Sequence, residues 1–329
     1  MVFTVIGAGS WGTALAMQMA RNGTTYLWGR NASHLHSMQK SRSNETYLPG
    51  IKFPDKLILE TDIEKAIAQS DAVLVVSPSH AFGEILEKIK PFLGSRPLAW
   101  ASKGFEPGSG RFLHVVAQEI LGEQKPIALV TGPSFALDVA QGKPTLVTVA
   151  STHEKFAHAV AHALHNEKFR VYLSDDIIGA ELGGAVKNVL ALATGICDGM
   201  QLGDNTRAAI LTRGMAEMMR LGKAMNCKTE TLMGLSGLGD LVLTCTGDLS
   251  RNRRMGLALG RGQSIEDAKK EIGQVVEGIG TAQEVVRLAK QYKVDMPISE
   301  HVLKVVQGKI TPKQAVTELM SRGPRQEFD

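Results

Sequence analysis

Short apolar runs alternate with helix-length segments through the first half of the chain. Segments with helical spacing cover residues 12–22, 81–90, 111–121 and 153–165. The apolar runs cover residues 2–6, 25–28, 57–60, 72–76, 97–101, 126–130, 145–149 and 169–173. The run at 72–76 is apolar without alternation, which is typical of a strand covered on both faces. The pattern predicts an α/β fold with a largely parallel sheet and helices on both of its faces.

The pattern changes after about residue 178, where helical spacing continues and strands stop. Helical segments cover residues 179–196, 205–225, 237–245, 251–260, 278–293, 297–307 and 311–320. We therefore expect two domains, an α/β domain over residues 1–178 and an all-α domain over residues 179–329. The tail from Ser321 to Asp329 contains Gly323 and Pro324 and is expected to be loosely held.

Composition and charge are those of a soluble globular protein. Of the 329 residues, 43% are hydrophobic and 21% are charged, and the formal net charge is +4. Because no long Lys/Arg block is present, a small anionic substrate or cofactor is a better candidate partner than nucleic acid or a membrane surface. The chain enters an apolar run at Val2 without a signal-peptide pattern, and we find no apolar stretch near the length of a membrane span. A cytoplasmic protein is expected.

The three cysteines, Cys197, Cys227 and Cys245, lie in segments that we interpret as helices. Their odd number and their spacing match no metal motif, so we expect reduced thiols in the core. No His/Cys/carboxylate cluster points to a metal either.

A glycine-rich motif, residues 7–12 with the sequence Gly-Ala-Gly-Ser-Trp-Gly, follows the first apolar run and opens a helical segment. Gly7 permits a tight turn, Gly9 lets a pyrophosphate approach the backbone, and Gly12 allows close packing of helix on strand. The N-terminus of the helix offers N–H groups to phosphates. The motif therefore predicts a dinucleotide site in a doubly wound domain of the Rossmann type.

The end of the second apolar run bears on the choice of cofactor. NAD-specific sites carry an Asp or Glu there, which binds the ribose hydroxyls. This run ends Tyr-Leu-Trp-Gly-Arg-Asn at residues 26–31, and Arg30 could pair with the 2′-phosphate of NADPH. NADPH is favoured and NADH remains possible; the alternative is that Arg30 is a solvated loop residue.

Ligands of such sheets bind beyond the carboxyl ends of the strands, where three polar turns follow predicted strands. The turns are residues 77–79, 102–105 and 131–136. Lys103 is the only cation between Arg96 and Arg111. It is a candidate binding residue, although an ordinary surface lysine explains its position equally well.

Two isolated charges in the second half suggest acid–base chemistry. Lys187 is the only charged residue between Glu181 and Asp198, and Asp240 stands equally alone within 231–247. Unpaired charges in apolar surroundings are costly to bury, so we hypothesise that the two side chains meet. Gly183, one turn before Lys187, is expected to leave open space beside its side chain. The alternative is that Lys187 extends to the surface and Asp240 caps a helix.

A basic turn precedes the helical segment at 251–260. Ser250 is a natural N-cap, and Arg251 and Asn252 would lie in the first turn. A cation there opposes the helix dipole unless an anion binds, which suggests a phosphate; an exposed basic patch is the alternative. Glu277 precedes a further helix and could bind the nicotinamide amide or cap the helix.

Taken together, these motifs resemble those of bacterial NAD(P)-dependent glycerol-3-phosphate dehydrogenases over nearly the whole chain. The resemblance rests on the glycine motif at 7–12, Ser-Lys-Gly at 102–104, Thr-Gly-Pro-Ser-Phe-Ala at 131–136, Val-Lys-Asn-Val at 186–189, Gly-Leu-Gly-Asp-Leu at 237–241 and Ser-Arg-Asn-Arg at 250–253.

The resemblance implies reduction of dihydroxyacetone phosphate to sn-glycerol 3-phosphate, with Lys187 as the acid/base and Asp240 as its partner. It implies an enzyme that supplies glycerophospholipid synthesis, and it makes Asn188 and Thr244 plausible further contacts. The sequence does not give the oligomeric state, although we expect a homodimer through the helical domain. Besides Gly7, Gly9 and Gly12, the implied cofactor residues are Ser10, Trp11, Arg30, Lys103, Ala136, Arg251, Val275 and Glu277. The implied substrate residues are Lys103, Gly132, Ser134, Lys187, Asp240, Ser250, Arg251 and Asn252.

Two other functions remain open at this stage. One is a related two-domain dehydrogenase for a hydroxy acid or a hydroxyacyl thioester, whose carboxylate would also suit Arg251. The other is a nucleotide-sensing regulator without chemistry, which has no use for the isolated Lys187 and Asp240.

Overall fold

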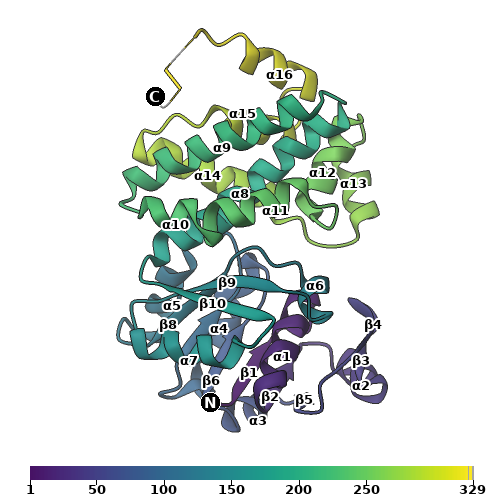
Figure 1. Ribbon diagram of the computed structural model, residues 1–329, viewed down its shortest axis with the longest axis vertical. Coiled ribbons are helices and arrows are strands. Elements are labelled where there is room, and N and C mark those ends of the chain that lie inside the picture. Colours follow the sequence, from purple (N-terminus) through teal and green to yellow (C-terminus); the bar gives the residue numbers. More distant parts are fainter. Residues whose placement is uncertain (325, 328–329) are drawn as a thin grey trace. The chain divides into compact units, whose positions relative to one another are not determined.

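The computed structural model describes residues 1–324 and 326–327, which form two compact units (Figure 1). The first unit holds Met1–Glu106 and Arg111–Ile177. The second holds the short segment Pro107–Gly110 and the described residues from Ile178 onward. The part of the predicted tail at 325 and 328–329 lies outside the described residues. Within the described part of that tail, Arg322 Nη2 donates to Asp295 Oδ2 at 2.6 Å.

The first unit contains an eight-stranded sheet in the order β5-β2-β1-β6-β7-β8-β9-β10. Each of the eight apolar runs forms one of these strands, which confirms the α/β interpretation. β8 and β9 pair antiparallel, and the other neighbours pair parallel. The strands are β1 (Phe3–Ile6), β2 (Thr25–Trp28), β5 (Leu57–Leu59), β6 (Ala72–Val75), β7 (Leu98–Trp100), β8 (Ile127–Thr131), β9 (Thr145–Ala150) and β10 (Phe169–Ser174).

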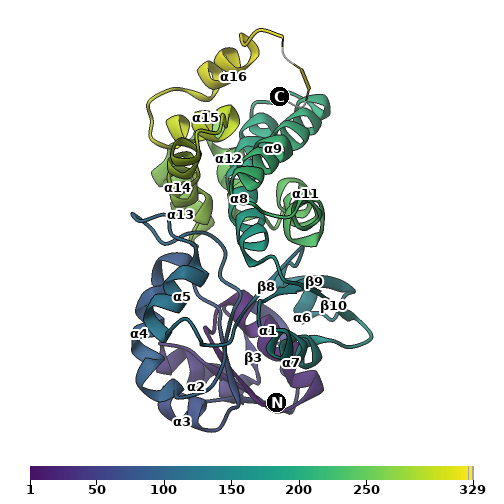
Figure 2. The same cartoon turned by 90° about the vertical axis from the view of Figure 1, so that its left-hand side faces the viewer.

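Helices cover both faces of this sheet, as Figures 1 and 2 show. One apolar core joins Val5, Leu74 and Val130 of the strands to Leu15 and Val160 of two helices on one face. The next residues along the strands face the opposite way, where Trp100 lies against Phe82 with 5.9 Å between ring centroids. The helices of this unit are α1 (Ser10–Asn22), α2 (Ala32–Ser41), α3 (Ile63–Ala68), η1 (Ser79–Ala81), α4 (Phe82–Leu93), α5 (Leu113–Leu121), α6 (Ala136–Ala140) and α7 (Glu154–Leu164).

Several short elements of the first unit were not predicted from the sequence. These are the helices α2, α3 and α6 and the small antiparallel pair of β3 (Ser43–Asn44) with β4 (Leu48–Lys52). The burial pattern of β4 is mostly exposed. Elements this short, or this exposed, carry too few apolar positions to establish a period.

The second unit is entirely helical over its described residues, as predicted. The sequence pattern missed α10 and α13 and placed the start of α11 too early, because residues 235–239 form a separate π-helical turn, η2. The helices are α8 (Ile177–Gly199), α9 (Asp204–Ala224), α10 (Thr229–Met233), η2 (Leu235–Gly239), α11 (Asp240–Thr246), α12 (Arg251–Gly260), α13 (Ile265–Ile272), α14 (Glu277–Tyr292), α15 (Pro297–Val306) and α16 (Pro312–Met320).

Helix α8 is the central helix of this unit (Figure 2). Its 23 residues are long and apolar enough to cross a membrane by length and composition, so our expectation of no such stretch was wrong. The helical segment predicted from the sequence covered only residues 179–196, whereas the helix runs from Ile177 to Gly199. Within the structure, 94% of its apolar window is buried, which is the environment of a core helix.

The cysteines are free, and one of them lies outside a helix. Cys227 is in the connection between α9 and α10, which corrects the helical interpretation of its segment. Its amide N–H donates to the carbonyl of Gly222 at 2.9 Å and so closes the end of α9. Cys197 and Cys245 are buried, and burial raises the pKa of the Cys245 thiol to about 12.

A buried carboxylate of α9 caps a neighbouring helix. Glu217 is 1% exposed, and its oxygens accept from Ile298 N at 2.5 Å, Ser299 N at 3.1 Å and Ser299 Oγ at 2.9 Å. These donors lie in the first turn of α15, whose N–H groups lack partners within the helix. Burial raises the pKa of Glu217 to about 7, and the hydrogen bonds from Ile298 and Ser299 limit that rise.

We predict that Glu217 makes the stability of the protein depend on pH. Its pKa rises from 4.5 to about 7 on folding, so the folded protein holds the proton to higher pH than the unfolded chain. Its contribution to stability is therefore present at low pH and is lost as pH rises through about 7. The free energy of unfolding of wild type minus that of Glu217→Gln should fall by up to about 3 kcal/mol between pH 5 and pH 8. Urea titrations measure this, with the exposed Glu230→Gln as control; a difference independent of pH would contradict it.

Candidate functional site

The glycine motif forms the predicted turn between β1 and α1. Gly7 has a φ of +127°, and its N–H donates to the carbonyl of Trp28 on β2 at 2.8 Å. A Cβ on Gly12 would overlap the carbonyl of Gly7, whereas a Cβ on Gly9 would meet nothing within 4 Å. The turn is thus tight at Gly7 and Gly12 and open at Gly9, where no side chain caps α1. These features fit a pyrophosphate at the N-terminus of α1.

The strand order brings the polar turns together. The chain builds β2 and β5 on one side of β1 and then returns to its other side with β6, so the order reverses between β1 and β6. Ligands of doubly wound sheets bind at such a reversal. The turns after β6, β7 and β8 follow strands that are neighbours and parallel to β1, so they lie along the same edge.

Two of these turns meet at one carbonyl oxygen. Lys103 Nζ donates to Gly132 O at 3.1 Å, and Ser134 Oγ donates to the same oxygen at 3.0 Å. Gly132 has a φ of +128°, a conformation that favours glycine. Ala136 is the first residue of α6, which packs on α1. The structure therefore gathers Lys103, Gly132 and Ser134 in one place in the first unit.

Arg30 lies two residues after the end of β2 and is exposed. Its neighbour Gly29 lies against Ala8 of the glycine turn, since a Cβ there would come 2.7 Å from Ala8 Cβ. Asn31 caps α2 by accepting from His34 N at 3.1 Å. A guanidinium at the end of the second strand suits a phosphate better than ribose hydroxyls.

Lys187 and Asp240 meet inside the second unit. Lys187 Nζ donates to Asp240 Oδ1 at 2.5 Å and to Thr244 Oγ1 at 2.9 Å. Thr244 Oγ1 itself donates to the carbonyl of Asp240 at 2.6 Å, so the hydroxyl is oriented to accept from the ammonium. Lys187 is 7% exposed and Asp240 is 1% exposed. Both alternatives, an extended surface lysine and a separate capping aspartate, are therefore wrong.

A close backbone approach makes this meeting possible. A Cβ on Gly183 of α8 would lie 2.5 Å from Ser236 O and 2.9 Å from Gly237 Cα. Gly183 therefore admits the backbone of η2 rather than leaving open space beside Lys187, which corrects our expectation. Because η2 runs directly into α11, this contact sets where Asp240 begins that helix.

The basic turn has the predicted cap and a role for its asparagine. Ser250 Oγ accepts from Arg253 N at 3.2 Å, so Ser250 is the N-cap of α12. Asn252 Nδ2 donates to Asn188 Oδ1 at 2.8 Å, and Asn252 Oδ1 accepts from Gly278 N at 2.9 Å. Asn252 thus joins α12 to α8 and to the start of α14, beside Lys187.

Arg251 projects from the first turn of α12 and keeps contact with solvent. Partial desolvation lowers its pKa, and the negative charge of Glu277 counteracts this effect. Glu277 is the first residue of α14, and Val275 before it is 45% exposed. Arg251 and Glu277 therefore lie near one another, and Val275, two residues before Glu277, presents an apolar side chain to solvent.

Glycines also fix how α12 lies on α8. A Cβ on Gly195 would overlap the carbonyl of Arg253, and a Cβ on Gly256 would overlap that of Leu192. One turn further on, Gly199 and Gly260 touch in the same way, with 3.0 Å from each added Cβ to the other Cα. The two helices pack backbone against backbone, and this places Asn252 beside Asn188.

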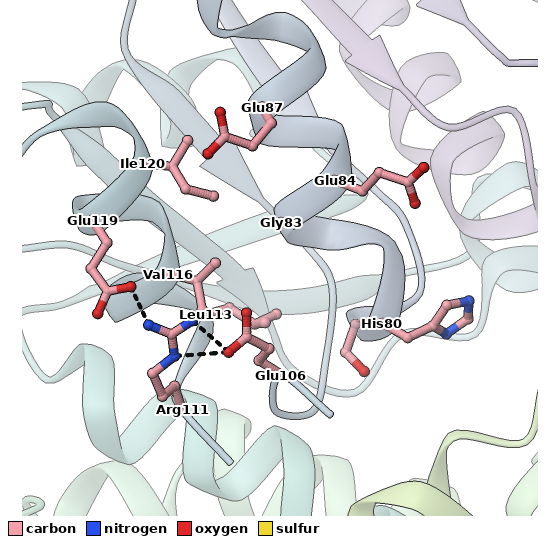
Figure 3. A pocket seen from close by; sticks show the side chains of 11 residues that line it. His80, Gly83, Glu84, Glu87, Glu106, Arg111, Leu113, Val116, Glu119 and Ile120 are labelled. Carbon is pink, nitrogen blue, oxygen red and sulfur yellow. Dashed lines mark hydrogen bonds and ion pairs between the residues drawn. The ribbon is translucent and has the colours of Figure 1, made fainter. Parts of the chain in front are cut away.

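A separate cavity of about 460 Å³ lies between α4 and α5 in the first unit (Figure 3). Among the lining side chains, Arg111 pairs with two glutamates: its Nη2 lies 2.7 Å from Glu106 Oε2, and its Nη1 contacts Glu119. The residues that line the cavity are Ser79, His80, Gly83, Glu84, Glu87, Glu106, Arg111, Leu113, Val116, Glu119 and Ile120. None of our candidate site residues is among them, so this acidic cavity is not the candidate site.

Sequence comparison finds two adjoining family matches. Residues 2–157 match the family described as NAD-dependent glycerol-3-phosphate dehydrogenase N-terminus, and residues 176–317 match NAD-dependent glycerol-3-phosphate dehydrogenase C-terminus. Glycerol-3-phosphate dehydrogenase (NAD(P)+) from Stenotrophomonas maltophilia is 56% identical over 329 residues, covering 98% of this chain and 96% of its own. The protein of that name from Xanthomonas oryzae is 56% identical over 326 residues, with the same coverage.

Solved structures give a consistent result. The crystal structure of glycerol-3-phosphate dehydrogenase from Coxiella burnetii matches with a TM-score of 0.93 at 44% identity, covering 98% of this chain and 99% of that one. A ketopantoate reductase of the PanE/ApbA family from Ralstonia eutropha matches with a TM-score of 0.58 at 17% identity, covering 96% of this chain and 100% of that one. The second likeness concerns the fold alone.

We predict that Gly256→Ala destabilises the protein by about 1–3 kcal/mol, because the added methyl group meets the backbone of α8 rather than a movable side chain. Gly280→Ala on α14 is the matched control, since a Cβ there meets nothing within 4 Å and alanine favours the helix by up to about 1 kcal/mol. Denaturant unfolding of both variants measures the difference. Equal stability of Gly256→Ala and wild type would show that α12 can shift on α8 at no cost.

Proposed function

Because the chain belongs to the NAD-dependent glycerol-3-phosphate dehydrogenase family, we propose that Lys187 is the general acid that protonates dihydroxyacetone phosphate during its reduction. The chain is an NAD(P)-dependent oxidoreductase with glycerol-3-phosphate dehydrogenase function.

The observation that carries the proposal is the buried contact of Lys187 with Asp240. A lysine that is 7% exposed needs a charged partner, and Asp240 Oδ1 at 2.5 Å provides it. Thr244 adds a second fixed acceptor at 2.9 Å. These two acceptors hold the ammonium nitrogen in one place, as a proton donor requires. Asp240 also favours the charged form of the lysine, which carries the proton to be donated.

Reduction of the ketone adds a hydride to its carbon and a proton to its oxygen. When bound, the nicotinamide supplies the hydride. Lys187 donates its proton to the oxygen, so that a hydroxyl group forms and no alkoxide is left. The neutral amine then regains a proton from solvent. In the reverse direction the amine of Lys187 accepts the proton of the hydroxyl group.

We propose that the phosphate of the substrate binds at the basic turn of α12. Ser250, Arg251 and Asn252 supply a hydroxyl, a guanidinium and the N-terminus of a helix, a combination that suits a dianion. Lys103, Gly132 and Ser134, gathered in the first unit, are proposed as further substrate contacts. Binding energy from the phosphate then helps to position the ketone, since it comes from a group that does not react.

The cofactor residues are proposed on the fit of the glycine turn described above. Residues 1–178 would bind the dinucleotide, and residues 179–329 would supply the acid and the phosphate turn. With Lys103, the proposed contacts are Gly7, Gly9, Ser10, Trp11, Gly12, Arg30, Ala136, Arg251, Val275 and Glu277. Arg30 leads us to propose a preference for NADPH over NADH.

We also propose that the enzyme acts in the cytoplasm as a homodimer and supplies sn-glycerol 3-phosphate for glycerophospholipid synthesis. The support for this part is the resemblance of the chain to bacterial enzymes of the family. Size-exclusion chromatography with light scattering tests the homodimer.

We predict that Lys187→Ala abolishes turnover of dihydroxyacetone phosphate and leaves NADPH binding within about twofold of wild type. The variant loses the proton donor, a contribution of about 10²–10⁴ in rate for general acids. Turnover is followed by NADPH oxidation, and binding by NADPH fluorescence. Lys290→Ala, at an exposed position of α14, is the control. Activity retained in Lys187→Ala would exclude Lys187 as the acid.

We predict that Arg30→Ala raises KM for NADPH by about 10-fold or more and leaves KM for NADH nearly unchanged. The expected loss corresponds to a charge-assisted bond with the 2′-phosphate, worth about 1.5–3 kcal/mol. Steady-state kinetics with each cofactor measure it, with the exposed Arg170→Ala as control. An equal change of both KM values would contradict the assignment of Arg30 to the 2′-phosphate.

A further inference from the structure

Asp198, near the C-terminal end of α8, binds two arginines from different helices. Its Oδ2 accepts from Arg253 Nε at 3.1 Å and from Arg253 Nη2 at 2.8 Å. Its Oδ1 accepts from Arg207 Nε at 2.8 Å. The Asp198 side chain is 6% exposed and that of Arg253 is 10% exposed. Both oxygens of this buried carboxylate accept hydrogen bonds from guanidinium groups. Such paired, charge-assisted bonds hold the two arginine side chains in a fixed geometry.

Arg253 stands directly after the proposed phosphate turn, 250–252. Its backbone N–H donates to Ser250 Oγ, which closes the turn, and its Nη1 donates to Asp248 Oδ1 at 2.7 Å just before the turn. Two carboxylates thus surround one guanidinium, so Arg253 brings no net positive charge to the turn. Arg251 has neither of these partners and keeps contact with solvent, which leaves it as the cation for an anionic ligand.

Two neighbouring residues of the first turn of α12 are therefore tied to α8. Asn252 binds Asn188, next to Lys187, and Arg253 binds Asp198 further along the same helix. Arg251 precedes both of them and sits on a turn that cannot rotate without breaking these bonds. The sequence motif alone does not show which of the two arginines is neutralised by carboxylates. The contacts of Arg253 with Asp198 and Asp248 show it.

We propose that Asp198 is a positioning residue that acts through Arg253 to hold the phosphate turn in register with Lys187. This inference rests on the proposed function of residues 250–252. Asp198 does not touch the substrate, and its effect is confined to substrates that carry a phosphate. A purely structural role of the same pair would instead lower activity toward every substrate alike.

The test compares dihydroxyacetone phosphate with unphosphorylated dihydroxyacetone in Asp198→Asn and Arg253→Lys. Asp198→Asn keeps the shape of the side chain and removes its charge, whereas Arg253→Lys keeps the charge and loses the paired guanidinium bonds to Asp198. We expect kcat/KM for dihydroxyacetone phosphate to fall about 10-fold or more, since such bonds contribute about 1.5–3 kcal/mol. Values for dihydroxyacetone and KM for NADPH should stay within about twofold of wild type. Arg254→Lys, the exposed neighbour on α12, is the matched control.

Three outcomes overturn the inference: no change for either ketone, an equal loss for both, or the same loss in Arg254→Lys. The thermal unfolding midpoint is recorded for each variant, and if Asp198→Asn does not fold, the charge-conserving Arg253→Lys carries the test.

A further variant, Arg251→Ala, distinguishes failure of the role of Asp198 from failure of the proposed phosphate site. If Arg251→Ala removes the preference for the phosphorylated ketone and Arg253→Lys does not, only the role of Asp198 fails. If Arg251→Ala keeps that preference, the phosphate turn itself is wrongly assigned.

Discussion

The second unit depends on the closeness with which other backbones approach α8. Gly183 admits η2, while Gly195 and Gly199 admit α12. Gly278, at the start of α14, has a similar role, because a Cβ there would lie 2.7 Å from the carbonyl of Asn188. Each approach brings a functional side chain to the same helix. The arrangement of Lys187, Asp240 and Asn252 is therefore a consequence of backbone packing at glycines, and the polar contacts complete it.

Two charged residues of the apolar helix α8 are buried beside partners of opposite charge. Burial of an ammonium group costs several kcal/mol unless a counter-charge and further hydrogen bonds compensate. Asp240 supplies the counter-charge for Lys187, and Thr244 supplies a hydrogen bond from the same short helix, one turn later. Near the C-terminal end of α8, the buried carboxylate of Asp198 is paired with Arg253 in the same way. Lys187 and Asp198 of α8 are thus each matched by an opposite charge within the second unit.

Much of the fold followed from sequence because its main elements are long and periodic or wholly apolar. The eight strands are apolar runs, of which β1, β6, β7 and β8 are wholly buried, and a run of this kind needs no alternation to be detected. The short α10, the polar α13 and the π turn η2 were missed, because a period needs several turns to show. At the site, isolation of Lys187 and Asp240 in the sequence pointed to their pairing. Asp198 and Arg253 gave no such signal, because other charged residues stand near each of them in the sequence, such as Asp204 after Asp198 and Arg254 after Arg253.

The contacts between α8 and α12 restrict how this part of the chain can change during evolution. When a core side chain grows, a neighbour can usually shrink to make room. At Gly195 and Gly256 the neighbouring atoms belong to the main chain, which cannot be replaced by a smaller group. Accommodation there requires a shift of a whole helix, and α12 carries Asn252 with it. Substitutions at these positions are therefore coupled to ligand geometry, although neither glycine is proposed to touch a ligand.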